Sequence, residues 1–496
     1  MKMFLLFLCV LLLFSCPEYD DTEARMNGIM IDCARLLEKH DYYYRLIDFL
    51  SEWDMNTLLI HFSDDHGISI ALPGYENLAH PEAFTPEEVR DLVEYAGKRG
   101  IDVIPELEVF GHTRYITDHP DYHHLYVGNR SEQVVFSAVD PLNPETVSLM
   151  RSMIAEVAAL FPSQYLHLGC DEVNLSGLGM NDKKKDATIW ANYVNQMISF
   201  AHENGKTPMI WSDHVRKDPN IADMLNKHVV LVEWNYDPNY VPRGLDKLKE
   251  SGFNMIIMAP SISCWRNRVI PVRPQLDNVD AHASAVKDGM ACGMLNTVWL
   301  PMRYLQNSMW YGMAYGAWLV NHGTTMNLKK FHRQFVKKTF GVRLDREFDW
   351  FLKNWVQLHL DRRFYSAIAD KNYAILKDPE RLAELERVRG LSSDMLSEPI
   401  MRKQLKNTAI LESMYLSTDI MYVLSEGLLI LSEKDVASNH TNDLVQKLDA
   451  VIASAEDEWD TGRFPNDPAK FEAKFPNQTN SHLLIVLRML KEQIKN

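Results

Sequence analysis

The chain has 496 residues and a formal net charge of −15. Its length is sufficient for two or three domains. The acidic balance, without any basic stripe, argues against nucleic-acid binding. No group of Cys and His residues has the spacing of a metal site, so the sequence predicts neither a metal nor another cofactor.

The first 15 residues have the composition of a secretory signal peptide. Lys2 precedes an apolar run over residues 4–14, which is shorter than the roughly 20 residues needed to span a bilayer. The run ends in LFSC (residues 13–16), which resembles the bacterial lipobox, in which Cys16 becomes the lipidated N-terminus. An ordinary signal peptide with an incidental cysteine is the alternative.

Residues 16–26 are polar and acidic, which predicts a solvated tether. We therefore expect a protein of the bacterial cell envelope, held on the outer membrane by its lipid alone. Glu18, Asp20 and Asp21 resemble the surface-export signal of some Gram-negative lipoproteins. Any flexible tether has this composition, so the periplasmic face is the alternative location.

Residues 27–325 alternate short apolar segments with amphipathic ones. Near-continuous apolar strands separated by helices predict a parallel sheet covered on both faces, and eight such units fit a (β/α)₈ TIM barrel. A doubly wound open sheet is the alternative, although no GxGxxG motif opens the first unit. The predicted strands are 28–33, 57–62, 101–107, 165–170, 208–211, 228–234, 253–258 and 291–299.

Polar and aromatic residues follow the apolar part of most predicted strands. The carboxyl ends of barrel strands meet on one face, where active sites are built, so we expect these side chains to lie together. They are Arg35, Asp64, Asp65, Glu108, His112, Asp171, Glu172, Trp211, Asp213, Trp234 and Trp299.

Residues 326–496 have helical periodicity and predict a separate, mainly α-helical C-terminal domain. Its aromatic and Met residues are interpreted as core, and residues 460–478 as a long loop. The predicted helical segments are 327–340, 345–361, 379–396, 401–431, 443–457 and 480–495.

The adjacent acids Asp171 and Glu172 are the strongest chemical signal. Cleavage of a glycosidic bond needs a proton for the leaving oxygen and stabilisation of positive charge at the anomeric carbon, and two carboxyl groups usually divide this work. Burial of two acids together should raise the pKa of one, as a general acid at neutral pH requires. A solvated pair that caps the next helix is the alternative.

The segment HLGCDEV (residues 167–173) resembles the HxGGDE signature of glycoside hydrolase family 20, the β-N-acetylhexosaminidases, with Cys170 in place of the second glycine. The Cys variant and the following NLSGLG (174–179) look most like the hexosaminidase D-type branch. Further similar segments, in family order, are GIMIDCAR (28–35), LLIHFSDDHG (58–67), VIPELEVFGHT (103–113), MIWSD (209–213) and VEWNY (232–236).

The resemblance implies a retaining exo-β-N-acetylhexosaminidase that removes terminal β-linked N-acetylgalactosamine or N-acetylglucosamine from glycans. In such enzymes the acetamido group of the substrate is the nucleophile and forms an oxazolinium ring. Asp171 would orient and stabilise that group, while Glu172 would protonate the leaving oxygen and then deprotonate the attacking water.

The resemblance also implies a set of substrate-binding residues. Arg35 would bind hydroxyl groups of the terminal sugar. Asp65 and His112 would form a supporting polar network, although His112 could equally be a structural residue. Aromatic side chains would wall the pocket and stack on the sugar, although each alone also fits a barrel core. They are Trp211, Trp234, Tyr236 and Trp299.

The sequence departs from the family pattern at two strands. The strand-seven Tyr, which donates to the acetamide, has no clear counterpart in MAPSISCW (residues 258–265). Tyr236, Trp265 or Tyr304 would have to replace it. The strand-eight WxE, whose Glu holds the outer hydroxyls of a gluco sugar, is WLP (residues 299–301). The preference between the two sugars therefore stays open.

Three rival hypotheses remain at this point. The protein could be a non-catalytic carbohydrate-binding lipoprotein on a degenerate barrel. It could use an enzyme-borne nucleophile such as Glu106 or Glu108. It could also apply the same mechanism to another amino sugar, or to sulfated or longer glycans.

Overall fold

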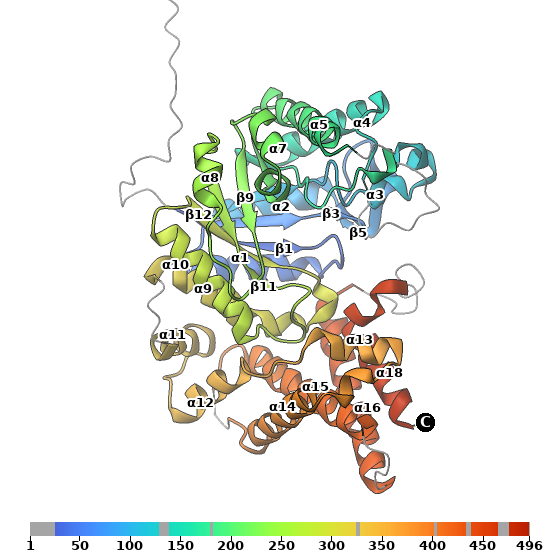
Figure 1. Ribbon diagram of the computed structural model, residues 1–496. Helices are drawn as coiled ribbons and strands as arrows, with labels where there is room; N and C mark the ends of the chain where they lie inside the picture. The colour runs from blue at the N-terminus through green and yellow to red at the C-terminus, as the bar shows by residue number, and fades with distance from the viewer. Residues whose placement is uncertain are drawn as a thin grey trace, which may run out of the picture.

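The computed structural model describes residues 25–127, 138–178, 182–323, 328–400, 404–432, 438–464 and 476–495. The predicted signal peptide and the predicted lipidation site Cys16 lie outside these residues. The chain forms a strand-and-helix part and, beside it, a helical part built from the C-terminal sequence (Figure 1).

The first part is a closed barrel of eight parallel strands, which confirms the predicted fold. The last barrel strand pairs with the first, with Met26 opposite Gly293 and Ile31 opposite Val298, and this pairing closes the ring. The barrel strands are β1 (Met26–Asp32), β2 (Thr57–His61), β6 (Asp102–Glu106), β7 (Tyr165–His167), β8 (Thr207–Trp211), β9 (Val230–Trp234), β10 (Ile256–Ala259) and β12 (Gly293–Val298).

Both faces of the barrel strands are buried, which explains their apolar sequences. Met30 of β1 packs inside the barrel with Leu59 and Leu295. Its neighbours Ile29 and Ile31 point outward into the larger core shared with the surrounding helices. The alternation of side chains along each strand thus fills two separate cores.

Helices cover the outside of the barrel (Figure 1). Helix α2 (Pro86–Gly97) begins sharply because Thr85 and Glu88 form a reciprocal capping box and Pro86 occupies its first turn. The main covering helices are α1 (His40–Glu52), α2 (Pro86–Gly97), α4 (Pro144–Leu160), α5 (Lys183–Glu203), α7 (Pro219–Met224), α8 (Leu245–Glu250), α9 (Arg273–Lys287) and α10 (Trp310–His322).

A small second sheet follows β2 and was not predicted. It consists of β3 (Ser63–Asp64), β4 (Gly67–Ile70) and β5 (Ala79–Phe84). The strands β3 and β4 are too short for a periodic pattern to be read from the sequence, and β5 has the largely polar sequence AHPEAF with a proline, which does not resemble a strand. The sheet matters for the site because β3 and the turn after it carry Asp64, Asp65 and His66 at the mouth of the barrel.

The C-terminal domain is helical, as predicted. Its longest apolar helix, α15 (Thr408–Ser432), would be long enough to cross a membrane, but two-thirds of its most apolar window is buried (67%) within the protein, as in a core helix. The other helices are α11 (Leu328–Phe335), α12 (Arg346–Trp355), α13 (Arg362–Asp370), α14 (Pro379–Ser397), α16 (Ser438–Gly462) and α18 (Leu483–Lys495).

Buried polar contacts join the two parts. Arg463, just after α16, forms an ion pair of 3.0 Å with Glu38 of the barrel, and both side chains are almost fully buried. Gln306 donates to the Glu38 carboxylate (2.7 Å) and to the carbonyl oxygen of Gly462 (3.0 Å). The predicted loop after residue 460 contains a short helix, η8 (Pro476–Ser481), which lies against the mouth of the barrel.

Candidate active site

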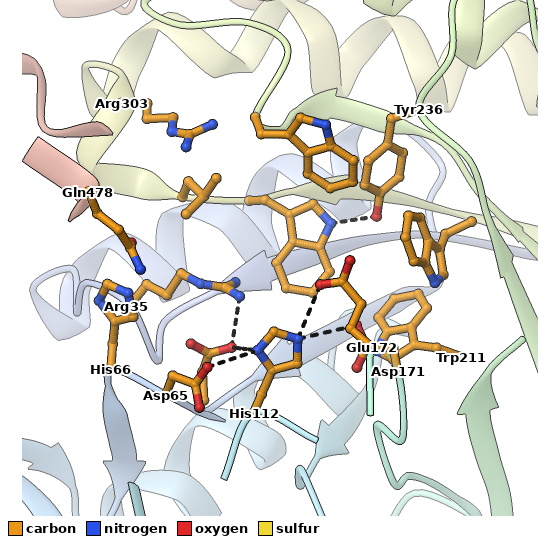
Figure 2. Close-up of a pocket in the computed structure, with 15 residues that line it drawn as sticks. Arg35, Asp65, His66, His112, Asp171, Glu172, Trp211, Tyr236, Arg303 and Gln478 are labelled. Atoms are coloured by element: carbon orange, nitrogen blue, oxygen red, sulfur yellow. Dashed lines mark hydrogen bonds and ion pairs between the residues drawn. The ribbon is translucent and has the colours of Figure 1, made fainter. Parts of the chain in front are cut away.

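A cavity of about 350 Å³ opens at the carboxyl ends of the strands (Figure 2). This volume is at the lower end of the range for small-molecule sites. All nine catalytic and substrate-binding residues predicted from the sequence line it. The complete lining is Arg35, Asp64, Asp65, His66, His112, Asp171, Glu172, Trp211, Trp234, Tyr236, Trp265, Trp299, Leu300, Arg303 and Gln478.

The turn after β7 presents the two adjacent acids to this cavity. Gly169, Cys170 and Glu172 have φ angles of +63°, +74° and +48°, in the left-handed region that non-glycine residues rarely adopt. A Cβ atom at Gly169 would collide with the carboxyl group of Glu108, so glycine is required there. Strained backbone of this kind is typical of functional sites.

His112 links both acids to the other charged residues of the cavity. Its Nε2 lies 3.7 Å from an Asp171 oxygen and 3.5 Å from a Glu172 oxygen. On the other side of the ring, Nδ1 lies 3.5 Å from Asp64 and 3.4 Å from Asp65. Burial alone would disfavour a charged ring, but these four carboxylates raise the pKa of His112 well above its usual value.

Asp171 is the acid whose pKa is raised. Burial is the main cause, and the neighbouring carboxylates of Glu172 and Asp213 add to it, while His112 opposes it. The result is a pKa of about 7. Because only 9% of Asp171 is exposed, its carboxyl group holds its proton far more tightly than that of a solvated aspartate. The side chain nevertheless borders the cavity.

Arg35 is held rigidly by two buried carboxylates. One guanidinium nitrogen lies 2.9 Å from Asp32 and another 2.8 Å from Asp64. The guanidinium also lies 5.1 Å from the centre of the Trp299 ring. Burial would raise the pKa of Asp64, but Arg35 and two histidines lower it well below its usual range, so Asp64 is an anion.

A second layer of polar groups lies behind the cavity wall. Glu106 accepts a hydrogen bond of 2.6 Å from the indole of Trp211 and lies 2.9 Å from His61. Burial, with Asp171 and Glu106, raises the pKa of Glu108 well above its usual value, and its carboxyl group accepts from the backbone of Cys170 (3.3 Å). Neither Glu106 nor Glu108 lines the cavity.

Five aromatic side chains form one wall of the cavity. The indole of Trp299 donates a hydrogen bond of 2.6 Å to the hydroxyl oxygen of Tyr236. Trp265 lies edge-on to Trp234, with ring centres 6.0 Å apart, and 5.0 Å from Tyr236. Of the three residues proposed to replace the strand-seven Tyr, Tyr236 and Trp265 line the cavity, whereas Tyr304 does not.

Several lining residues were not among the predicted site residues. Asp64 is the first member of the DD pair, of which only Asp65 was assigned. His66 follows it directly. Arg303 stands four residues after Trp299, and Gln478 enters from η8 of the C-terminal domain. No local pattern marks Gln478, because only tertiary packing brings it to the barrel.

Two groups of side chains have the spacing of metal ligands. In the part of the chain that the structure describes, they are His61 with Glu106 and Glu108, and His112 with Asp171 and Glu172. In the first group, His61 and Glu106 already pair with each other. The second group is the acid pair and its histidine, whose charges already balance in part. Neither group therefore requires a metal to explain its arrangement.

Part of the sequence and the fold are similar to those of known proteins. The model for "Glycosyl hydrolase family 20, catalytic domain" matches residues 25–269. A beta-hexosaminidase of Vibrio furnissii is 29% identical over 280 residues, covering 47% of this chain and 44% of that protein. Human hexosaminidase D is 25% identical over 253 residues, covering 47% of this chain and 50% of that protein.

A solved beta-N-acetylhexosaminidase of Bacteroides fragilis has a TM-score of 0.51 at 20% identity, covering 64% of this chain and 70% of that one, and shows the same fold. The chain spans about half the length of the curated relatives it matches. Residues 25–269, which hold seven of the eight barrel strands and the acid turn, are thus similar to the catalytic domain of glycosyl hydrolase family 20.

Proposed function

We propose that this chain is a retaining exo-β-N-acetylhexosaminidase of substrate-assisted mechanism. The observation that carries the proposal is the placement of Asp171 and Glu172 side by side at the cavity, both within 3.7 Å of His112. The similarity to the Vibrio and human hexosaminidases supports the same reaction class. The Cys170 variant of the signature favours the hexosaminidase D-type branch.

In the first step, Glu172 donates its proton to the glycosidic oxygen as the bond from that oxygen to the anomeric carbon breaks. The carbonyl oxygen of the substrate acetamide attacks the same carbon from the opposite face and closes an oxazolinium ring. The Asp171 carboxylate accepts a hydrogen bond from the acetamide N–H, which becomes more acidic as positive charge develops. His112 balances the negative charge of the pair.

In the second step, the Glu172 carboxylate removes a proton from water, whose oxygen attacks the anomeric carbon and opens the ring. The configuration of the anomeric carbon is inverted in each of the two steps and is therefore retained overall. The substrate supplies the nucleophile in this scheme, which agrees with the position of Glu106 and Glu108 behind the cavity wall. An enzyme-borne nucleophile would have to reach the sugar from the lining itself.

The size of the cavity supports removal of a single terminal sugar. About 350 Å³ accommodates one sugar ring better than a stretch of polymer. Trp299 and Trp211 supply apolar surface for the ring, and Arg35 supplies donors for its hydroxyl groups. We propose terminal β-linked N-acetylgalactosamine and N-acetylglucosamine as substrates, because the WLP segment offers no carboxylate that would select between them.

The test is hydrolysis of aryl β-N-acetylglucosaminide and β-N-acetylgalactosaminide by the purified chain, with product stereochemistry followed by NMR. We expect release from at least one substrate with the β-anomer formed first. A thiazoline that mimics the oxazolinium ring should inhibit. Binding of the sugars without turnover would instead support a carbohydrate-binding lipoprotein, and turnover indifferent to the thiazoline would support an enzyme-borne nucleophile.

We propose further that the protein is anchored in a bacterial envelope through a lipid on Cys16. The support is the LFSC segment and the acidic tether that follows it. Cys16→Ser should move the protein from the detergent phase to the aqueous phase in a phase-separation experiment. Equal partitioning of the two forms would refute the anchor and leave an ordinary signal peptide.

A further inference from the structure

A buried cation without an acidic partner lines the cavity beside Arg35. Arg303, at the end of η4 (Pro301–Arg303), is 7% exposed. It donates hydrogen bonds to the carbonyl oxygen of Cys264 (3.1 Å) and to the hydroxyl oxygen of Ser481 (2.7 Å), while its Nε has no partner. Among the described residues, no carboxylate forms an ion pair with it. An arginine cannot shed its charge as a lysine can.

The groups around Arg303 add positive charge instead of removing it. Burial lowers the pKa of its guanidinium, and the charges of Arg268, Arg35 and Arg362 lower it further. Arg35 is already neutralised by two aspartates. Arg268 is buried, donates to the backbone of Asn480 (3.0 Å) and has no ion pair with a described carboxylate. A buried positive charge of this kind is costly unless a ligand balances it.

The C-terminal domain adds an amide on the same side of the cavity, where Figure 2 shows the Gln478 side chain between Arg303 above it and Arg35 and His66 below it. Gln478 of η8 lines the cavity and makes no hydrogen bond with any described residue. Its helix is fixed on both sides, because Ser481 accepts from Arg303 and the Asn480 side chain donates to Ser366 (2.8 Å). Two sets of donors, a guanidinium and an amide, are therefore held at one end of the cavity.

We propose that Arg303 and Gln478 form a subsite for a tetrahedral oxyanion ester, sulfate or phosphate, carried by the terminal 2-acetamido sugar. This inference rests on the proposed function, which places the anomeric carbon and the acetamide at Asp171 and Glu172. Figure 2 shows Arg303 and Gln478 across the cavity from that pair. In a pyranose ring the substituents at C4 and C6 lie at the end opposite C1 and C2.

The guanidinium suits this ligand because its planar donors match two oxygens of a sulfate or phosphate group. The anion would supply the balancing charge that the protein lacks, and Gln478 would donate to a further oxygen. A neutral sugar would leave the Arg303 charge uncompensated. The subsite therefore selects for charged substrates.

The experiment compares aryl β-N-acetylhexosaminides without a substituent, with a 6-sulfate, with a 4-sulfate and with a 6-phosphate, using the full chain. We expect kcat/KM for at least one ester to exceed that of the unsubstituted sugar by about tenfold or more, as a charge-assisted contact gives. Arg303→Gln should lose the preference in kcat/KM for the ester over the unsubstituted sugar, and Arg303→Lys should keep part of that preference. Arg266→Gln, outside the cavity lining, is the matched control and should leave the ratio unchanged.

Equal kcat/KM for all four sugars, or an ester preference that survives in a folded Arg303→Gln protein, would overturn the subsite. If Arg303→Gln does not fold, Gln478→Leu must lower the ratio instead. If no aryl sugar is hydrolysed, the proposed function fails, and calorimetry with N-acetylglucosamine and its 6-sulfate and 6-phosphate decides the subsite separately. Tighter binding of an ester than of the neutral sugar would support it, and equal binding would refute it.

Discussion

The two ends of the cavity differ in how their charges are balanced. At the acid end, defined by Asp171, Glu172 and His112, each charged group lies within 4 Å of an opposite charge. At the cation end, defined by Arg303 and Gln478, no described carboxylate pairs with the guanidinium. We propose that the balanced end transfers the proton and that the unbalanced end binds a charged group of the ligand.

Glu172→Gln is the strongest test of the acid end. The amide fills the same space but cannot protonate the leaving oxygen, so we expect kcat on substrates with poor leaving groups to fall by about 10³-fold. For activated aryl substrates, the rate of the first step should fall much less. A variant of nearly full activity on poor leaving groups would show that the general acid is another residue. The ratio between sulfated and neutral substrates should not change.

Asp171→Asn should have the next largest effect. The amide cannot supply the negative charge that stabilises the oxazolinium N–H, and we expect kcat to fall by about 10²-fold. Because the proposed reaction needs the Asp171 carboxylate, kcat/KM of the native protein should rise with pH through about 7, the pKa of Asp171. A pH profile with no inflection near that value would contradict this role.

The same substitution should stabilise the fold at alkaline pH. In the unfolded chain the Asp171 carboxyl group loses its proton near the ordinary aspartate pKa of 3.8, whereas in the folded protein it holds the proton up to a pH of about 7. Between these values the folded state binds more protons, so its free energy of unfolding falls as pH rises. The unfolding midpoint of Asp171→Asn should therefore exceed that of the native protein at pH 8 and converge with it near pH 4. An equal difference at both pH values would refute the shift.

Tyr236→Phe probes the aromatic wall between the two ends. Loss of the hydroxyl removes the acceptor of the Trp299 indole N–H, and the buried donor then has no partner. It also removes a possible donor to the acetamide. We expect about a tenfold loss of kcat/KM, as one hydrogen bond to a reacting group implies. Trp265→Phe is the matched comparison, because it changes the wall without touching the Trp299 bond.

The acid end could be predicted from the sequence because its signals are local. The eight strands are near-continuous apolar segments, and Arg35, Asp65, His112 and the acid pair lie three to six residues after the ends of their strands. The expectation that one buried acid has a raised pKa was also sound, but burial and like charges place the shift on Asp171. Which of the two acids has the raised pKa depends on how deeply each side chain is buried, and the spacing of residues in the sequence does not determine that burial.

The cation end escaped prediction for a different reason. Gln478 reaches the cavity only because the C-terminal domain packs on the barrel, with the buried Glu38–Arg463 pair and the Arg303–Ser481 hydrogen bond holding it there. The strands β3, β4 and β11 (Ser261–Ser263) were missed because such short segments carry no readable period, and β5 was missed because its sequence, AHPEAF, is largely polar and contains a proline. Contacts between distant segments and very short elements are both set by tertiary packing.

Gln478→Ala is expected to have the smallest effect and gives the sharpest separation of the two ends. Its amide is far from the acid pair in Figure 2, so loss of the side chain should leave kcat unchanged on every substrate. KM for the sulfated or phosphorylated sugar should rise by about threefold to tenfold, because one hydrogen bond to a charged ligand is lost equally in ground and transition states. KM for the neutral sugar should change by less than about twofold, since that sugar has no oxyanion to hold. A fall in kcat on the neutral sugar would show that Gln478 positions the reacting ring itself, and the distinction between a proton-transferring end and a charge-receiving end would then be lost.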